Sequence, residues 1–156
     1  MRPILTALIL FGFQASAYAE PGCLDRSKFP ALHKFIGTYQ TDDFLNDRAI
    51  SSRLKRLVGK DLALIRKNLS VRGPIDLTSC NLVVSGNAPH GGLDENAIVS
   101  FDLTTGEVCA GIRSESSNGE FAIYSGSKNF SSLPFAIKLW IYYINGSRAS
   151  VPVNFR

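Results

Sequence analysis

The sequence of 156 residues is poor in the side chains on which most metal sites and many catalytic sites depend. It has two histidines, His33 and His90, and its three cysteines lie far apart, so no cysteine or histidine spacing suits zinc. No serine stands in the glycine-flanked motif of a nucleophile elbow. We therefore predict no catalytic residue, no metal and no cofactor, and hence a protein that is not an enzyme.

A long hydrophobic run is also absent. The apolar stretch over residues 4–13 follows Arg2, and about ten residues cannot cross the roughly 30 Å hydrocarbon core of a membrane. The small residues Ala17 and Ala19 then stand at the two positions that a signal peptidase reads. We predict a signal peptide over residues 1–19 and a periplasmic or secreted protein without a transmembrane segment.

The mature chain predicted from this cleavage begins at Glu20. Cys23 raises the alternative of a lipoprotein, but Glu20-Pro21-Gly22 lacks the apolar residue expected three places before a lipidated cysteine. Removing 19 residues from 156 leaves 137, enough for a single domain over residues 20–156. The net charge of +4 falls to +3 without Arg2, a mild excess that requires no anionic partner. The oligomeric state is not encoded in these features.

Three cysteines in an oxidising compartment permit one disulfide and one remaining thiol. The entropy of loop closure predicts nearly the same stabilisation for the possible disulfide pairings, so it does not choose between them. The alternation of residues along the strands is a better guide, because Cys80 falls on the apolar side of its predicted strand. Cys109 instead shares its side with the polar Glu107 and Arg113. We predict a Cys23–Cys80 disulfide and a free Cys109.

The spacing of apolar residues is helical in the first half of the mature chain. A short segment covers residues 29–36, and Asp43 or Asp47 is placed to cap a helix that ends at Gly59. Apolar residues continue at helical spacing as far as Leu69.

The second half has the alternation of a sheet, after Gly73-Pro74 breaks the helical pattern. We predict strands over residues 81–86, 97–103, 107–113 and 121–124, with tight turns at Thr104-Thr105-Gly106 and Ser117-Asn118-Gly119. Ser131 or Ser132 then begins a closing helix whose apolar stripe is Leu133, Ile137, Trp140, Ile141 and Ile144. The predicted fold class is α+β, with an antiparallel sheet meander, N-terminal helices and a C-terminal helix packed on the sheet.

The loop between the first two predicted strands has the most unusual chemistry. Pro89 restricts the backbone before His90, while Gly91 and the following glycine allow the backbone after it to turn. We therefore expect the imidazole of His90 to project from a rigid part of the loop. The imidazole is suited to bonding a carboxylate of a partner, and the nearby Asp94 and Glu95 are placed to orient or charge the ring. The alternative is an ordinary surface loop whose proline and glycines only make turns.

Pro89-His90 in such a loop, followed by these strands, resembles the inhibitor of vertebrate lysozyme (Ivy) family over residues 80–113. The loop of that family reads Cys-Lys-Pro-His-Asp-Cys, and its histidine bonds the catalytic carboxylates of lysozyme. The resemblance implies a periplasmic, non-enzymatic inhibitor of lysozyme or of another cell-wall hydrolase. Asn87 and Gly92 stand where the loop cysteines would be, so ordering the loop would oppose binding. Vertebrate lysozymes are usually basic, so electrostatic repulsion would also oppose their binding to a basic partner.

Basic residues gather on the predicted helices, and among them we single out Arg53, Lys55, Arg56 and Lys60. One interpretation is an envelope-associated module that binds an anionic surface; the other is the solvated face of amphipathic helices. Nucleic acid is not expected as a partner, since no aromatic residues interleave with these charges. An uncharacterised hydrolase is a third interpretation. Binding that is driven by charge would weaken steeply with salt, whereas insertion of a loop into a cleft would persist.

Overall fold

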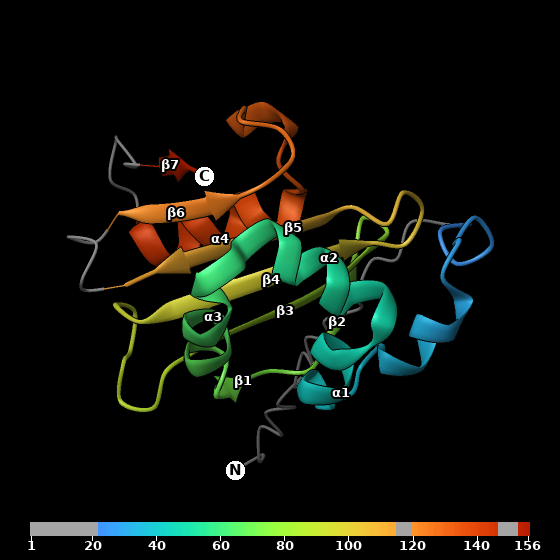
Figure 1. Cartoon of the computed structure of the whole chain (residues 1–156), viewed down its shortest axis with the longest axis horizontal. Helices are drawn as coiled ribbons and strands as arrows, with labels where there is room; N and C mark the ends of the chain where they lie inside the picture. Colours follow the sequence, from blue (N-terminus) through green and yellow to red (C-terminus); the bar gives the residue numbers. More distant parts are fainter. Residues whose placement is uncertain (1–21, 115–119, 147–152) are drawn as a thin grey trace, which may run out of the picture.

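The computed structural model describes residues 22–114, 120–146 and 153–156. One sheet lies between two helical layers (Figure 1), with α1 to α3 over one face and α4 over the other. The predicted α+β class is therefore confirmed. The predicted signal peptide and the predicted turn at Ser117-Asn118-Gly119 lie outside the described residues.

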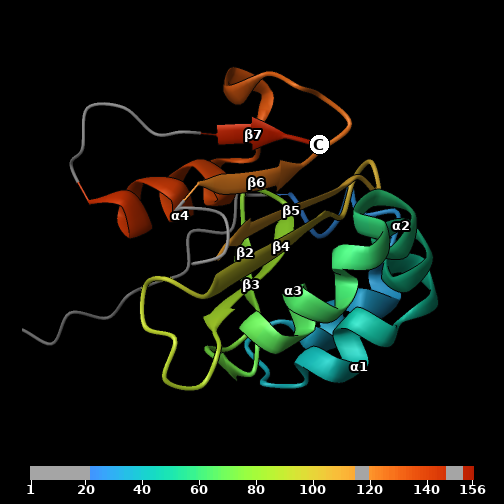
Figure 2. The same ribbon diagram turned by 60° about the vertical axis from the view of Figure 1, so that its left-hand side comes forward.

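The sheet contains seven strands within these ranges, in the order β1-β3-β4-β5-β6-β7, and β2 also pairs with β3. Figure 2 shows the strands nearly edge on. All pairs are antiparallel except β6 with β7. The strands are β1 (Val71–Arg72), β2 (Asp76–Thr78), β3 (Asn81–Asn87), β4 (Asn96–Asp102), β5 (Val108–Arg113), β6 (Phe121–Tyr124) and β7 (Val153–Phe155). The four strands predicted from the sequence correspond to β3 to β6, and their meander is confirmed.

The first helical layer consists of α1 (Thr41–Asn46), α2 (Arg48–Val58) and α3 (Leu62–Asn68), preceded by a 3-10 helix over Pro30–Phe35. Of the two predicted caps, Asp47 caps α2, because its carboxylate accepts a hydrogen bond from the amide of Ala49 at 2.9 Å. The amphipathic α2 buries Ile50, Leu54 and Val58 against the sheet. This layer places α3 beside the end of β3, next to the loop that follows it.

The helix α4 (Phe135–Asn145) covers the opposite face of the sheet. All five residues of its predicted stripe are buried, and the indole of Trp140 packs edge to face on Phe121 at 5.3 Å between ring centroids. Gly111 of β5 leaves room for the Trp140 ring, since a Cβ there would lie 2.7 Å from that ring. The predicted start of the helix is wrong: Ser132 ends a 3-10 helix (Phe130–Ser132), and Pro134 stands before the first turn of α4.

Cys23 and Cys80 form a disulfide, with 5.4 Å between their Cα atoms, and Cys109 is free. The pairing predicted from strand alternation is thus confirmed. The prediction that Cys109 faces a polar surface is wrong, since its side chain is only 4% exposed and lies in the core beneath α4. Both faces of the central strands are buried because a helix covers each of them. No helix in the described parts of the chain is long and apolar enough to cross a membrane.

Candidate functional site

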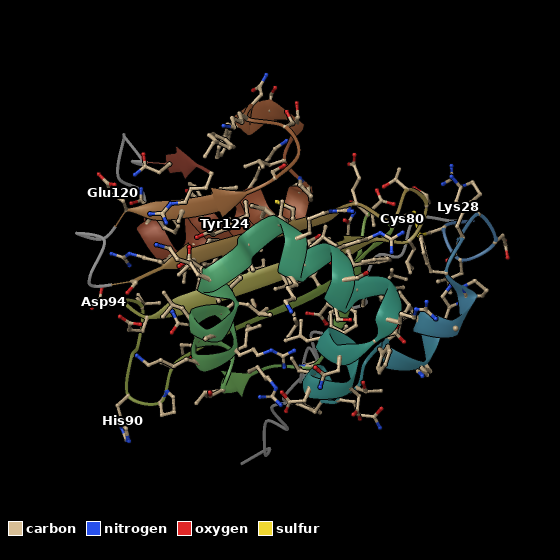
Figure 3. The ribbon with its side chains drawn as sticks, in the orientation of Figure 1. Lys28, Cys80, His90, Asp94, Glu120 and Tyr124 are labelled. Carbon is tan, nitrogen blue, oxygen red and sulfur yellow. A yellow bond between two sulfur atoms is a disulfide. The ribbon has the colours of Figure 1, made fainter. Side chains whose placement is uncertain are left out.

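His90 stands at the tip of the loop between β3 and β4, which we call the His90 loop (residues 88–95). Its side chain is exposed and points away from the sheet (Figure 3), and it forms no hydrogen bond or ion pair with any residue that the structure describes. The backbone of His90 is left-handed, with φ at 60°, a region that residues other than glycine rarely adopt. The sequence assigned the freedom of the backbone to the two glycines, but only Gly92 has a positive φ, at 50°. Gly91 instead provides space, because a Cβ there would lie 2.6 Å from the Cβ of Glu95.

The His90 loop is closed by its own backbone. The amide of Ala88 donates to the carbonyl of Glu95 at 2.9 Å, which joins the two ends of the loop. Within it, the amide of Gly91 donates to the carbonyl of Ala88 at 2.9 Å, and the amide of Asp94 donates to the carbonyl of Gly91 at 3.0 Å. The loop is therefore a compact series of turns that raises His90 above the sheet.

A side chain from β5 holds the outer part of the loop. The guanidinium of Arg113 donates to the carbonyl of Leu93 at 2.7 Å and lies 3.5 Å from the carboxylate of Asp94. The same guanidinium stacks on the ring of Phe121, 5.8 Å from its centroid, and the Arg113 side chain is only 15% exposed. A fixed, planar donor group of this kind restricts the loop more than a flexible ammonium would.

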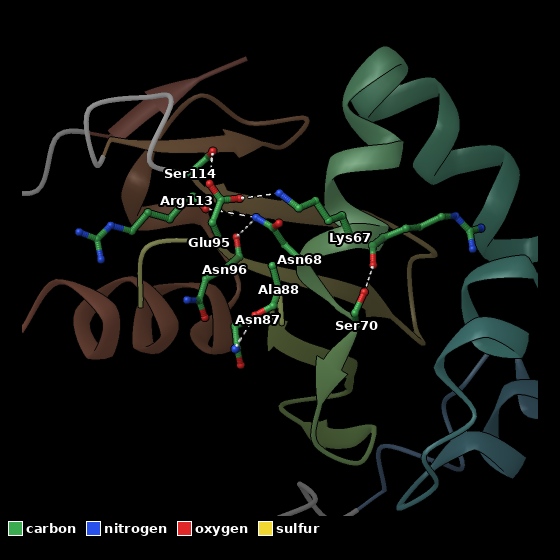
Figure 4. A network of polar contacts seen from close by, with 10 residues as sticks. Lys67, Asn68, Ser70, Asn87, Ala88, Glu95, Asn96, Arg113 and Ser114 are labelled. Atoms are coloured by element: carbon green, nitrogen blue, oxygen red, sulfur yellow. Dashed lines mark hydrogen bonds and ion pairs between the residues drawn. The ribbon is translucent and has the colours of Figure 1, made fainter. Parts of the chain in front are cut away.

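The base of the loop is held by a second set of polar contacts, drawn in Figure 4. The carboxylate of Glu95 accepts from the hydroxyl of Ser114 at 2.9 Å and lies 3.7 Å from the ammonium of Lys67 on α3. The amide group of the buried Asn68 donates to the carbonyls of Asn96 and Arg113, both at 3.3 Å. Helix α3 and strand β5 are thereby both joined to the loop.

These contacts change the expected roles of the two acidic residues. Asp94 and Glu95 were expected to orient or charge the imidazole, but their carboxylates are engaged with Arg113 and with Ser114 and Lys67. Figure 3 shows Asp94 at the sheet end of the loop, well away from the tip that carries His90. In the structure, both residues support the loop.

Polar contacts also occupy the positions of the missing loop cysteines. The Asn87 side chain donates to the carbonyl of Ala88 at 2.9 Å, and the carbonyl of Gly92 accepts from the side chain of Asn96 at 2.6 Å. Sequence reasoning missed Asn96, Arg113 and Ser114, which are distant in the chain or lie inside strands. The available signal was the predicted hairpin of residues 97–103 and 107–113, since neighbouring antiparallel strands bring their ends to one edge. That signal does not set the register that places Asn96 opposite Arg113.

A groove of about 600 Å³ adjoins the His90 loop, and we call it the α4 groove. Leu93, Asp94 and Arg113 line one side of it, and residues 143–146 at the end of α4 line the other. Leu93 is 52% exposed and Tyr143 is 74% exposed. The loop and the groove therefore form one continuous surface at the edge of the sheet.

The basic residues singled out in the sequence lie on the helical layer, away from the His90 loop. Arg53 and Arg56 line a cavity of about 770 Å³ beside the β4–β5 turn, at the other end of the strands. Arg53 is engaged, donating to the carbonyl of Ala49 at 2.6 Å and stacking on Phe29. Lys55, Arg56 and Lys60 form no ion pair with any residue that the structure describes. The structure does not bring these residues together with His90.

Two buried groups titrate far from neutrality. Burial raises the pKa of the Cys109 thiol to about 12, so the thiol stays protonated near neutral pH. Burial, and then the carboxylate of Asp61, raise the pKa of the Tyr124 hydroxyl to about 12, and that hydroxyl donates to Asp61.

Within the described ranges no cluster of histidine, cysteine and acidic side chains is arranged to hold a metal ion.

The His90 loop thus presents an exposed histidine on a braced backbone, at the edge of a sheet that helices cover on both faces. Residues 49–144, more than half of the chain and including the whole His90 loop, match the family model "Inhibitor of vertebrate lysozyme (Ivy)". The chain belongs to the Ivy family. Members of this family are inhibitors rather than enzymes and are typically periplasmic. No curated protein and no solved structure matches the chain significantly.

Proposed function

We propose that this protein inhibits a lysozyme or a related cell-wall muramidase by inserting the His90 loop into the active-site cleft. The observation that carries the proposal is the exposed, unpartnered imidazole of His90 at the tip of a braced loop, within the segment that matches the Ivy family. We further propose that the protein works in the periplasm after removal of a signal peptide over residues 1–19.

The chemistry of the target explains why one imidazole is sufficient. Lysozyme uses one carboxyl group as acid and a second as nucleophile or stabiliser, so a group that bonds to them blocks both roles. One ring nitrogen of a neutral His90, or both nitrogens of the cation, can donate to a carboxylate, and no residue described in this chain competes for them. A hydrogen bond to a charged carboxylate contributes about 1.5–3 kcal/mol to the free energy of binding.

The bracing of the loop reduces the cost of this insertion. A free loop would lose conformational entropy on binding, which subtracts from affinity. In this chain Arg113 and Glu95 restrain the loop beforehand, and they do so without a disulfide between positions 87 and 92. The departure from the cysteine pattern is therefore compatible with the same mode of binding.

The test is inhibition of a purified vertebrate lysozyme by the wild type and by His90→Ala. The variant should raise the inhibition constant at least about tenfold, as expected for loss of about 1.5 kcal/mol. His33→Ala, which removes the other histidine from the 3-10 helix Pro30–Phe35, is the control and should inhibit like the wild type. A wild type inactive at micromolar concentration against animal and bacterial muramidases overturns the proposal. Equal inhibition by His90→Ala overturns the loop mechanism.

A second candidate function follows from the exposed cations of α2 and the turn after it. Lys55, Arg56 and Lys60 have no acidic partner in the parts of the chain described, which suits contact with an anionic envelope surface. Replacing all three by Gln should then abolish binding to anionic vesicles at low salt, and leave inhibition of lysozyme unchanged. Vesicle binding by the triple variant equal to that of the wild type rejects this candidate.

A further inference from the structure

The loop tip alone offers little surface to a protein partner. Stable protein complexes bury about 800 Å² on each side, so residues beside the loop have to take part. The α4 groove begins where the His90 loop returns to the sheet, at Leu93 and Asp94. In both ribbon views the C-terminal end of α4 and the loop lie at the same side of the molecule (Figures 1 and 2). A partner seated on His90 would therefore cover the groove as well.

We propose that the α4 groove receives a lysine or arginine side chain of the inhibited muramidase, from the rim of its active-site cleft. The inference rests on the proposed function, and it adds the chemistry of a second contact. Three features of the groove point to a cation: a carboxylate, an aromatic ring and the end of a helix.

The carboxylate belongs to Asp94, whose side chain is 70% exposed at the groove. The ring is that of Tyr143, and its exposed face is suited to a cation within about 6 Å. The helix end carries about half a negative charge, and the last turn of α4 contains no basic residue to balance it. Each feature is weak by itself, but all three border one groove.

Arg113 is the one cation among the described lining residues, and it does not fill the site. Its guanidinium is directed to the carbonyl of Leu93 at 2.7 Å and is held under the loop, with only 15% of the side chain exposed. It approaches the Oδ1 atom of Asp94 at 3.5 Å, and an ionised carboxylate has further acceptor positions. A second cation can therefore reach Asp94 from the solvent side.

The exposed carboxylate of Asp94 gives a basic enzyme a local point of attraction on a chain that is basic overall. The net charge, +4 for the whole sequence and +3 without Arg2 of the proposed signal peptide, opposes such an encounter at long range. The exposed cations Lys55, Arg56 and Lys60 lie on α2 and the turn after it, whereas Asp94 lies within the His90 loop. Complementary charge at the contact surface is what sets orientation and excludes other partners.

The experiment compares four variants in their binding to a purified basic vertebrate lysozyme. Asp94→Asn should raise the dissociation constant about fivefold at low salt, and Tyr143→Leu about threefold, the range expected of exposed charge and cation–π contacts. The controls are Asp43→Asn, which removes the same charge from α1, and Tyr142→Leu, which removes an exposed ring that does not line the groove. Both controls should bind like the wild type.

The salt dependence separates the proposed contact from loosening of the loop. If Asp94 meets a cation of the enzyme, the affinity of Asp94→Asn should fall less steeply with salt than that of the wild type. An unchanged salt slope, or control variants that weaken binding as much, overturns the inference. Loss of affinity in His90→Ala with none in Asp94→Asn and Tyr143→Leu overturns the inference and leaves the proposed function standing. A wild type that binds no muramidase overturns both.

Discussion

The guanidinium of Arg113, at the end of β5, donates a hydrogen bond to the carbonyl of Leu93, at 2.7 Å, inside the His90 loop. The two residues are 20 positions apart in the chain, so the contact joins the loop to a distant strand. Together with the ion pair between Arg113 and Asp94, this contact makes the position of the outer part of the loop depend on a residue within the sheet.

Replacing Arg113 by Met should therefore weaken lysozyme binding about tenfold, because the loop loses its donor and has to be ordered on binding. Amide hydrogen exchange at Gly91 and Asp94, whose amides donate within the loop, should accelerate. Arg113→Lys should restore only part of the affinity, since an ammonium lacks the planar fork. The matched control is Arg72→Met: Arg72 also bonds a carbonyl and an aspartate, those of Leu69 and Asp42, but touches no loop residue. If exchange within the loop is unchanged in Arg113→Met, the positioning role is wrong.

Trp140 should be a main contributor to the stability of the α4 layer. Its side chain is 7% exposed and stacks on Phe121, so Trp140→Ala should lower the free energy of unfolding by about 3–5 kcal/mol. Thermal or urea unfolding measures the effect. Leu139→Ala is a suitable control, since Leu139 lies on the same helix but is 52% exposed, and its loss should change stability by about 0.5 kcal/mol or less. Equal losses in the two variants would show that α4 packs differently.

Cys109 should resist alkylation in the native protein at pH 8. Burial raises the pKa of its thiol to about 12, so almost no thiolate is present, and the side chain is 4% exposed. After unfolding in denaturant without a reductant, a thiol reagent should label Cys109 alone, because Cys23 and Cys80 are joined. Peptide mapping locates the label. A label on Cys23 or Cys80 contradicts the pairing, and rapid native labelling of Cys109 contradicts the burial.

Local patterns in the sequence were sufficient for the four strands β3 to β6, whereas the short strands β1, β2 and β7 were not predicted. The strand positions, the positive φ at Gly106, which is 80°, and the buried stripe of α4 all follow from periodicity and turn residues. The environment of Cys109 did not follow, because the alternation of residues in β5 cannot show that a helix 22 residues later, beginning at Phe135, covers its polar-looking side.

The residues at the tip of the His90 loop could be predicted from the sequence, but the residues that hold the loop in place could not. Pro89 and His90 stand out by their chemistry, whereas Arg113 and Ser114 are ordinary residues at the end of a strand. Their part depends on the register that sets Asn96 opposite Arg113, and register is a property of the folded sheet. The positive φ of His90 was likewise hidden, because adjacent glycines offered a simpler explanation of the turn.

Asp102 should make the β4–β5 turn sensitive to acid. Burial alone would raise the pKa of its carboxyl, but hydrogen bonds from Thr104 and Thr105 outweigh burial and leave the pKa below its ordinary value. A carboxyl with a lowered pKa in the folded state stabilises the protein above the unfolded pKa, and this contribution is lost as the pH falls through the folded pKa. Asp102→Asn should therefore be less stable than the wild type at pH 7, with the difference shrinking below about pH 4. A difference that is constant from pH 7 to pH 2 contradicts this assignment.

The left-handed backbone of His90 predicts a conflict between stability and binding. A residue with a Cβ at φ 60° is strained by roughly 1–2 kcal/mol, and glycine is not. His90→Gly should therefore unfold at a higher denaturant concentration than His90→Ala, by about 1 kcal/mol in free energy, although both lack the imidazole. Both variants should lose inhibition to a similar extent if the imidazole makes the contact. Chemical denaturation and inhibition assays on the same preparations separate the two effects. Equal stability of the two variants would mean that the loop relaxes to another conformation when the imidazole is removed. If His90→Gly inhibits like the wild type, the backbone of the loop makes the contact and the imidazole does not.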